Sequence, residues 1–289
     1  MTADPFAAHR GLLFTVAYEM LGSAADAEDV LQESWLRWAG VDRAQVRDAR
    51  AYLVRLVTRQ ALNRLRTLAR RREEYVGAWL PEPLLTAPDI ADDVVLAEGV
   101  SMAVLTVLET LGPAERAVFV LREVFELPYG EIAAAVGKPA ATVRQIARRA
   151  RAHVAARRPR VRVGRSEQQA VVERFMAALR TGRLEELMAV LAPDVVMIAD
   201  GGGVAAAALA PVRGAESVAA LLARAHRAAA GFSAATVWLN GAPAGRVEVG
   251  GEPAALGLVV EEGRVTRIYA VRNPRKLTRL DEPAELSRR

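Results

Sequence analysis

The fold of this chain is decided in residues 129–156, which read YGEIAAAVGKPAATVRQIARRARAHVAA. Two helical stretches, 129–136 and 140–156, flank the turn Gly137-Lys138-Pro139, and this pattern predicts a helix-turn-helix. On the second helix the apolar positions recur at steps of three and four, so one face is expected to pack inward. The inward positions are Val143, Ile146, Ala147, Ala150 and Val154.

The opposite face of the second helix is polar and basic. Arg144, Arg148 and Arg151 follow one another at steps of four and three, which places them in one line along the helix. Such a helix fits the major groove of DNA, where arginine binds guanine and glutamine binds adenine. A basic surface helix, or one that contacts RNA, is the alternative. The predicted DNA contacts are Thr142, Arg144, Gln145, Arg148 and Arg149.

Charge is arranged in blocks along the first half of the chain, which has 289 residues and a net charge of +5. Residues 50–72 hold eight arginines and no acid, and residues 73–115 hold nine acids and no base. Residues 138–165 hold ten basic residues and again no acid. Two basic blocks separated by an acidic one favour two separate contacts with a polyanion.

Composition excludes several classes of protein. The chain has no cysteine, which rules out a disulfide scaffold, a cysteine nucleophile, zinc fingers and iron–sulfur clusters. No run of eighteen apolar residues predicts a membrane span, and the N-terminus lacks the features of a signal peptide. With 52% hydrophobic residues, a soluble, cytoplasmic, globular protein without metal or cofactor is expected.

Residues 1–75 are predicted to form a helical unit, and residues 76–98 are predicted to be an acidic linker with prolines. One helix is predicted over 6–21, and a second begins after Ser23, which is expected to cap it. Trp35 and Trp38 are spaced like core positions of this second helix.

The long helix predicted over 49–72 carries a polar stripe on one face. The stripe consists of Arg55, Arg59, Asn63 and Arg66. A second helical unit, which contains the helix-turn-helix, is predicted over 99–158, and a basic linker follows over 160–166. Residues 166–289 read as helices, one strand, a third helix and an antiparallel strand meander, which predicts an α+β domain.

Taken together, residues 5–157 resemble the extracytoplasmic-function group of bacterial sigma factors. The phrase DAEDVLQES at 26–34 is similar to the region of that family that binds the clamp helices of the β′ subunit of RNA polymerase. The segment 52–66 is similar to the region that reads the −10 promoter element. The phrase LGPAER at 111–116, with Glu131-Ile132-Ala133 and Thr142-Val143-Arg144, resembles the region that reads the −35 element.

This resemblance assigns roles to residues. It implies that core RNA polymerase is contacted by four acidic residues and one glutamine of the phrase at 26–34. These are Asp26, Glu28, Asp29, Gln32 and Glu33. It implies that the stripe Arg55, Arg59, Asn63 and Arg66 reads the −10 element of promoter DNA. The helix-turn-helix residues named above would then read the −35 element, although Gln145-Ile146 replaces a Ser-Arg pair common in the family.

The C-terminal domain, 166–289, resembles a SnoaL-like, cone-shaped α+β barrel. Three phrases are similar to those of sigma factors with such a fused domain. They are Trp79-Leu80-Pro81-Glu82-Pro83-Leu84, Asp200-Gly201-Gly202-Gly203-Val204 and Asn273-Pro274-Arg275-Lys276-Leu277. We expect the three phrases to touch and the domain to regulate the sigma domains in cis, since a short tether gives it a high effective concentration.

Two other functions are alternatives to a sigma factor. A ligand-responsive helix-turn-helix regulator would use residues 166–289 as a sensor, and a small-molecule ligand of this domain is compatible with both interpretations. An enzyme of the isomerase or cyclase type would need paired acid–base groups. The candidates Asp194, Asp200, His226, Glu248 and Tyr269 show no pairing by spacing, so no catalytic residue is predicted.

Overall fold

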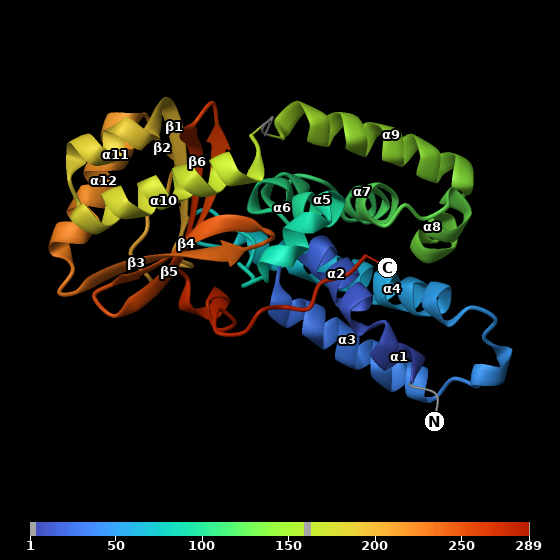
Figure 1. Ribbon diagram of the computed structural model, residues 1–289. Helices are drawn as coiled ribbons and strands as arrows, with labels where there is room; N and C mark the ends of the chain where they lie inside the picture. Colours follow the sequence, from blue (N-terminus) through green and yellow to red (C-terminus); the bar gives the residue numbers. More distant parts are fainter. Residues whose placement is uncertain (1–3, 159–162, 289) are drawn as a thin grey trace.

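The computed structural model describes residues 4–158 and 163–288, and the side chains of residues 69–73 are outside this description. Figure 1 shows a helical lobe and a lobe built on a sheet. Of the described helices, the nine up to Arg157 lie in the helical lobe and the three from Arg165 onward in the sheet lobe. Residues 160–162 of the predicted basic linker lie outside the described residues, and its last two residues begin a helix.

The N-terminal unit is built of helices α1 to α4. Gly22 ends α2 in the left-handed conformation, with φ of 67°, and the Ser23 hydroxyl accepts a hydrogen bond from the Asp26 amide at 3.2 Å. The predicted cap is therefore present, whereas the predicted first helix is broken at His9. The helices are α1 (Pro5–Ala8), α2 (Arg10–Leu21), α3 (Ala24–Ala39) and α4 (Ala49–Glu73), with a 3-10 turn at Arg43–Gln45.

The second unit is also helical and ends in the predicted helix-turn-helix. Gly137, with φ of 68°, ends the first helix of the helix-turn-helix, Tyr129–Val136, and lets the chain turn into the second, Ala140–Arg157. A 3-10 turn at Pro88–Asp92 precedes it, and a π-helical turn at Val120–Val124 extends α7. The helices are α5 (Val94–Gly99), α6 (Met102–Leu108), α7 (Pro113–Phe119), α8 (Tyr129–Val136) and α9 (Ala140–Arg157).

The C-terminal domain is the predicted α+β domain. Its helices are α10 (Arg165–Thr181), α11 (Leu184–Val190) and α12 (Ala215–Ala228), followed after the sheet by a 3-10 turn at Pro274–Lys276. Its strands are β1 (Leu191–Asp200), β2 (Val212–Arg213), β3 (Phe232–Leu239), β4 (Ala242–Val249), β5 (Glu252–Glu261) and β6 (Arg264–Val271). The strand order is β2-β1-β6-β5-β4-β3, antiparallel except for the parallel pair β1 and β6.

The sheet is buried on both faces at β5, where the alternation of side chains along the strand separates two cores. Ala254, Leu256 and Leu258 pack with the helices α10 and α12, which cover one face. Ala255 and Val259 point to the other face and pack with Leu80 and residues of α6. The sheet therefore contacts its own helices on one side and residues of the linker and of α6 on the other.

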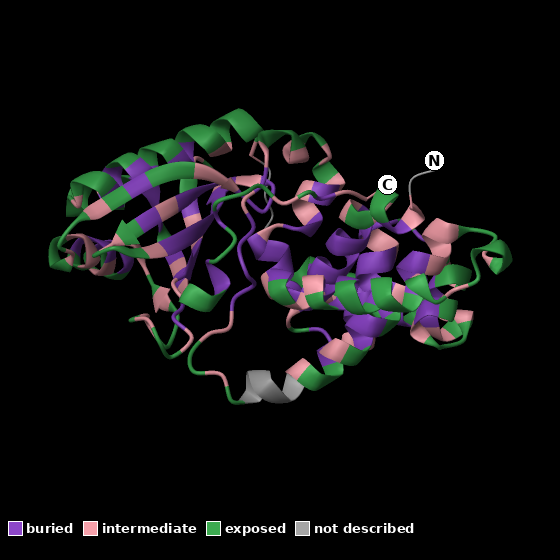
Figure 2. Ribbon diagram, turned by 90° about the horizontal axis from the view of Figure 1, so that it is seen from below, coloured by how far each residue is buried: buried purple, intermediate pink, exposed green. Residues whose placement is uncertain are grey.

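The two helical units share one continuous hydrophobic core. Buried residues from α2, α3 and α4 belong to the same cluster as those from α5 to α9 (Figure 2). Leu84 from the predicted linker also belongs to it, as does Leu286 near the C-terminus. In this structure the two units are thus packed against each other and not held apart.

Candidate functional site

The second helix of the helix-turn-helix presents the basic face expected from the sequence. All five inward positions of α9 are buried. Arg144, Gln145, Arg148 and Arg149 are exposed, and Thr142 in the first turn is half-buried. Arg151 is held by Glu123, with Nη2 and Oε1 2.6 Å apart, and Arg149 lies 4.0 Å from Glu115. Arg144, Gln145 and Arg148 therefore remain the better placed for DNA.

The polar stripe of α4 lies beside the helix-turn-helix. Arg59, Asn63 and Arg66 are exposed, while Arg55 is half-buried over the ring of Tyr52. Nη2 of Arg59 donates a hydrogen bond to the carbonyl oxygen of Ala134 in α8, at 2.9 Å. The predicted −10 reader helix therefore contacts the first helix of the helix-turn-helix directly.

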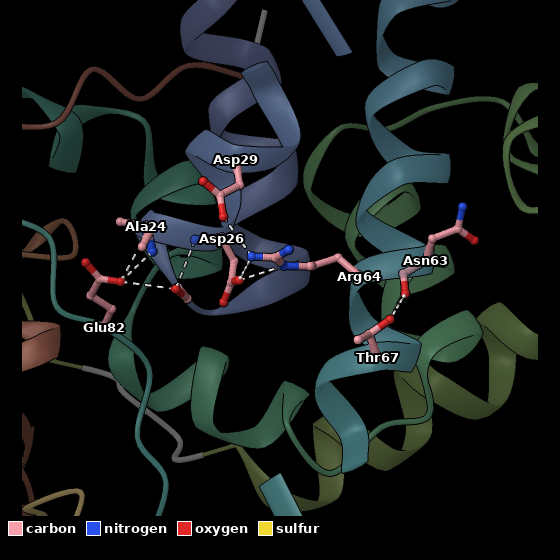
Figure 3. Close-up of polar contacts among 9 residues, drawn as sticks. Ala24, Asp26, Asp29, Asn63, Arg64, Thr67 and Glu82 are labelled. Atoms are coloured by element: carbon pink, nitrogen blue, oxygen red, sulfur yellow. Dashed lines mark hydrogen bonds and ion pairs between the residues drawn. The ribbon is translucent and has the colours of Figure 1, made fainter. Parts of the chain in front are cut away.

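The acidic face of α3 is partly engaged within the chain. Arg64 of α4 bridges Asp26 and Asp29, each at 2.7 Å (Figure 3). Glu28 lies 2.7 Å from Arg10 and 3.4 Å from Arg279. Gln32 and Glu33 are exposed.

Glu82 from the linker occupies the N-terminus of α3. Its Oε2 accepts hydrogen bonds from the amides of Ala24 at 2.8 Å and Ala25 at 3.3 Å, and from the Ser23 hydroxyl (Figure 3). A carboxylate is stabilised there by the free amides and the helix dipole. Burial raises the pKa of Glu82, and these amide bonds oppose the rise.

The three phrases of the predicted regulatory contact meet at Asp200, which is fully buried. Its Oδ2 accepts hydrogen bonds from the Leu80 amide at 2.9 Å and from Nζ of Lys276 at 2.7 Å. Its Oδ1 accepts one from the Tyr75 hydroxyl at 2.6 Å, and the Asn273 amide bonds the same hydroxyl. Nζ of Lys276 also lies 3.9 Å from the ring centre of Trp79.

The predicted linker differs from a solvated tether, because residues 80–84 are buried. This follows from its contacts: apolar side chains enter two cores, and Glu82 caps a helix. Gly201, Gly202 and Gly203 form the turn after Asp200, and Gly202 donates its amide to the Asp200 carboxylate. Pro81, Pro83, Pro274 and Leu277 lie in the same contact region, with only Pro274 exposed.

Sequence reasoning missed Asn240, which joins four parts of the chain. It lies in the turn between β3 and β4 with φ of 53°. Its Oδ1 accepts from the Leu84 amide at 3.0 Å, and its Nδ2 donates to the Tyr18 hydroxyl and to the Val100 carbonyl. The Asn-Gly pair 240–241, a common hairpin turn, was the one signal at this position.

The C-terminal tail was also missed. After Leu277 the chain leaves the sheet lobe and runs along the helical lobe to α2 (Figure 1). The Ser287 amide donates to the Thr15 hydroxyl at 3.0 Å, and Arg288 lies 2.6 Å from Asp93 and 3.5 Å from Glu126. The tail therefore connects both helical units.

One expectation for α3 was wrong. Trp38 is buried, but Trp35 is 47% exposed, because it lies on the flank of the apolar face beside the exposed Leu36. Trp35 is therefore a surface aromatic on the face that also carries Gln32.

The candidate acid–base groups of the C-terminal domain are dispersed. Asp194 and Glu248 are exposed, His226 bonds the Arg180 carbonyl, and Tyr269 is buried on the opposite face of the sheet from α12. Among residues 4–158 and 163–288, no three metal-ligating side chains gather in one place. None of the helices in this described part is long and apolar enough to cross a bilayer.

Comparison with known proteins agrees with the two helical units. The family model for sigma-70 region 2 matches residues 6–71, and that for sigma-70 region 4 matches residues 101–154. The sigma factor SigJ of Mycobacterium tuberculosis is 38% identical over 294 residues, which cover 96% of this chain and 94% of SigJ. A probable sigma factor of that organism, SigI, is 33% identical and covers 93% of this chain and 92% of its own.

The similarity extends to the three-dimensional structure. The crystal structure of M. tuberculosis SigJ matches with a TM-score of 0.76 and 34% identity, covering 96% of this chain and 98% of that one. These matches support the sigma-factor interpretation and not the ligand-responsive regulator. The chain belongs to the extracytoplasmic-function sigma factors, which bind core RNA polymerase and direct it to promoters, and it carries a C-terminal α+β domain.

Proposed function

We propose that this sigma factor rests in a closed arrangement that its C-terminal domain maintains, and that promoter recognition requires this arrangement to open. The single observation that carries the proposal is the contact between Arg59 of α4 and the Ala134 carbonyl of α8, at 2.9 Å. Promoter elements centred about 25 base pairs apart lie about 85 Å apart along B-DNA, at about 3.4 Å per base pair. Two units packed against each other in this way cannot place both reader helices on elements that far apart.

The C-terminal domain contributes three ties to this arrangement. Asp200 and Lys276 hold the linker at Leu80. Asn240 bonds Tyr18 in the first helical unit and Val100 in the second. The tail reaches Thr15 in one unit and Asp93 in the other. Regulation in cis then consists of weakening or strengthening these ties.

The proposed contacts of the open form are those predicted from the sequence. We propose that the β′ clamp helices bind the acidic face of α3, where Gln32 and Glu33 are exposed. The ion pairs of Asp29 and Glu28 are partly exposed, so their exchange for polymerase contacts costs little. The stripe of α4 would read the −10 element and the exposed face of α9 the −35 element. The C-terminal domain would act by binding, without a reaction of its own.

A distance measurement in the full chain tests the proposal. Since the chain has no cysteine, spin labels can be placed through Ala39→Cys at the end of α3 and Ala156→Cys near the end of α9, both exposed positions. We expect one narrow distance distribution for the free protein and a distance longer by tens of ångströms with core polymerase and promoter DNA. The pair Ala25→Cys and Ala39→Cys, both on α3, is the control that stays constant. An unchanged distance in a transcribing complex would refute the closed resting state.

A further inference from the structure

A cavity of about 100 Å³ lies inside the C-terminal domain. It is lined by α12, by strands of the sheet and by residues 206–208 of the loop that follows Asp200, and it is partly open to solvent. Ala207, Ala254 and Ala270 contribute only methyl groups to its wall, which leaves the space unfilled. Apolar walls of this kind favour the binding of small apolar molecules.

A single guanidinium borders this apolar space. Of the described residues that line the cavity, Arg272 alone carries a polar side chain. Its Nη1 donates to the Ala206 carbonyl at 2.5 Å, while its Nε is buried without a hydrogen-bond partner. Within the described part of the chain Arg272 forms no ion pair, and the carboxylate of Asp200 pairs with Lys276. A buried donor on a cation without an anion is unfavourable and is relieved by a ligand that supplies one.

We propose that this cavity binds a small apolar carboxylate, with its hydrocarbon chain inside and its carboxylate on Arg272. The volume sets the size of the ligand. An engineered cavity of about 150 Å³ holds benzene, so about 100 Å³ accepts a chain of three or four carbons. The guanidinium fork matches a carboxylate and discriminates against a neutral group of the same shape.

The position of the site connects it to the regulatory contact. The loop that closes the cavity begins at Asp200, and the Arg272 amide donates to the Asp200 carbonyl at 2.7 Å. A ligand beneath this loop would shift the position of Asp200, whose carboxylate bonds Leu80 and Lys276. This consequence rests on the proposed function, whereas the binding itself does not.

Methyl NMR of the full chain, labelled at methionine methyl groups, tests the binding. Met197 lines this cavity, and Met102 lines a separate cavity of about 320 Å³ between α6 and the sheet. Butyrate and its neutral isostere butyramide are titrated at pH 7. We expect a saturating shift of Met197 with butyrate, a dissociation constant on the order of 1 mM or below, and about tenfold weaker binding of butyramide.

Two substitutions make the result specific. Arg272→Gln is expected to remove the preference for butyrate, and Arg224→Gln, at an exposed position of α12, is the matched control that keeps it. Equal affinity for butyrate and butyramide, a shift of Met102 without Met197, or no saturating shift would each overturn the site. If butyrate binds as expected but the spin-label distance in the transcribing complex stays unchanged, the proposed function is refuted and the site stands.

Discussion

The side-chain amide of Asn240 donates a hydrogen bond to the hydroxyl of Tyr18, with Nδ2 and Oη 2.6 Å apart and 222 positions between them in the chain. Both residues are buried, Tyr18 at 0% and Asn240 at 1% exposure. The Tyr18 hydroxyl in turn donates to the Glu82 carbonyl at 2.7 Å. A turn of the C-terminal sheet is thereby fixed to the first helical unit and to the segment between the two units.

Replacing Asn240 isolates the contribution of this junction. In Asn240→Gly the new glycine tolerates φ of 53°, so the backbone conformation is kept. The side-chain hydrogen bonds to Leu84, Tyr18 and Val100 are removed. Because it leaves buried groups unpaired, we expect the free energy of unfolding to fall by about 2–4 kcal/mol, measured by urea denaturation. Glu262→Gly, at an exposed turn residue with φ of 51°, is the control and should be neutral or slightly stabilising. Equal effects of the two substitutions would show that the backbone alone accounts for the loss.

The buried Asp200–Lys276 ion pair is expected to contribute far more to the free energy of unfolding than an exposed ion pair does. Asp200→Asn leaves the Lys276 ammonium buried without its carboxylate, and we expect a loss of about 3–5 kcal/mol in the free energy of unfolding. Asp281→Asn breaks the pair of Arg246 with an 81% exposed carboxylate, so a loss below about 1 kcal/mol is expected. Urea denaturation of both variants tests the difference. Similarly small losses of unfolding free energy in the two variants would contradict a large contribution from the buried pair.

Glu19 makes the stability of the closed form dependent on pH. Neither of its carboxylate oxygens has a hydrogen-bond partner among the described residues, and burial raises its pKa well above 4.5 although Arg116 opposes the rise. The folded protein thus binds this proton more tightly than the unfolded chain. The contribution of Glu19 to stability is therefore fully present below about pH 4.5 and is lost as the pH rises toward the folded-state pKa.

The test is the pH dependence of Glu19→Gln, which stays neutral at every pH. Relative to the natural protein, this variant should gain stability between pH 4.5 and 8, by up to about 1.4 kcal/mol per pH unit. Denaturation at several pH values measures the slope, and Glu185→Gln at an exposed position should show none. Parallel curves for the natural protein and Glu19→Gln would mean that Glu19 titrates normally.

The elements that could be predicted from the sequence are those set by local patterns. The helix-turn-helix and the strands β3 to β6 follow from periodicity and glycine turns within short windows. The parallel pairing of β1 with β6 joins strands more than sixty residues apart, and β2 has only two residues, so neither produced a local signal. Trp35 was misplaced because spacing alone does not separate the flank of an apolar face from its centre.

The site divides in the same way. The exposed residues of α9 could be named from one helix, because inward and outward positions alternate with its period. The burial of residues 80–84 depends on acceptors and cores supplied by distant segments, so a proline-containing acidic stretch looked like a solvated linker. Asn240 acquires its role only through three partners at least 140 positions away.

Releasing the C-terminal tail should favour the open form. Leu286→Ser removes a side chain that is 8% exposed in the core shared by the helical units. A loss of about 2 kcal/mol would shift the equilibrium toward the open form by roughly thirtyfold, so run-off transcription at limiting sigma factor should increase. Leu209→Ser, at a position 71% exposed, is the control without effect. Unchanged transcription by a folded Leu286→Ser protein would remove the tail from the regulatory contacts.

Arg144 should carry sequence preference at the −35 element, whereas a basic residue that only meets phosphate should not. Arg144→Ala is expected to reduce discrimination at one base pair by about 1–3 kcal/mol and to leave preferences at the other positions intact, as measured by holoenzyme binding to single-substituted promoters. Arg157→Ala, at the exposed last turn of α9, is the matched loss of charge. If Arg157 contacts a DNA phosphate, its loss weakens binding to all promoter sequences equally and lowers the slope of log binding constant against log salt concentration by about one. A uniform loss for Arg144→Ala as well would mean that α9 meets the DNA backbone at this residue and that another side chain reads the base.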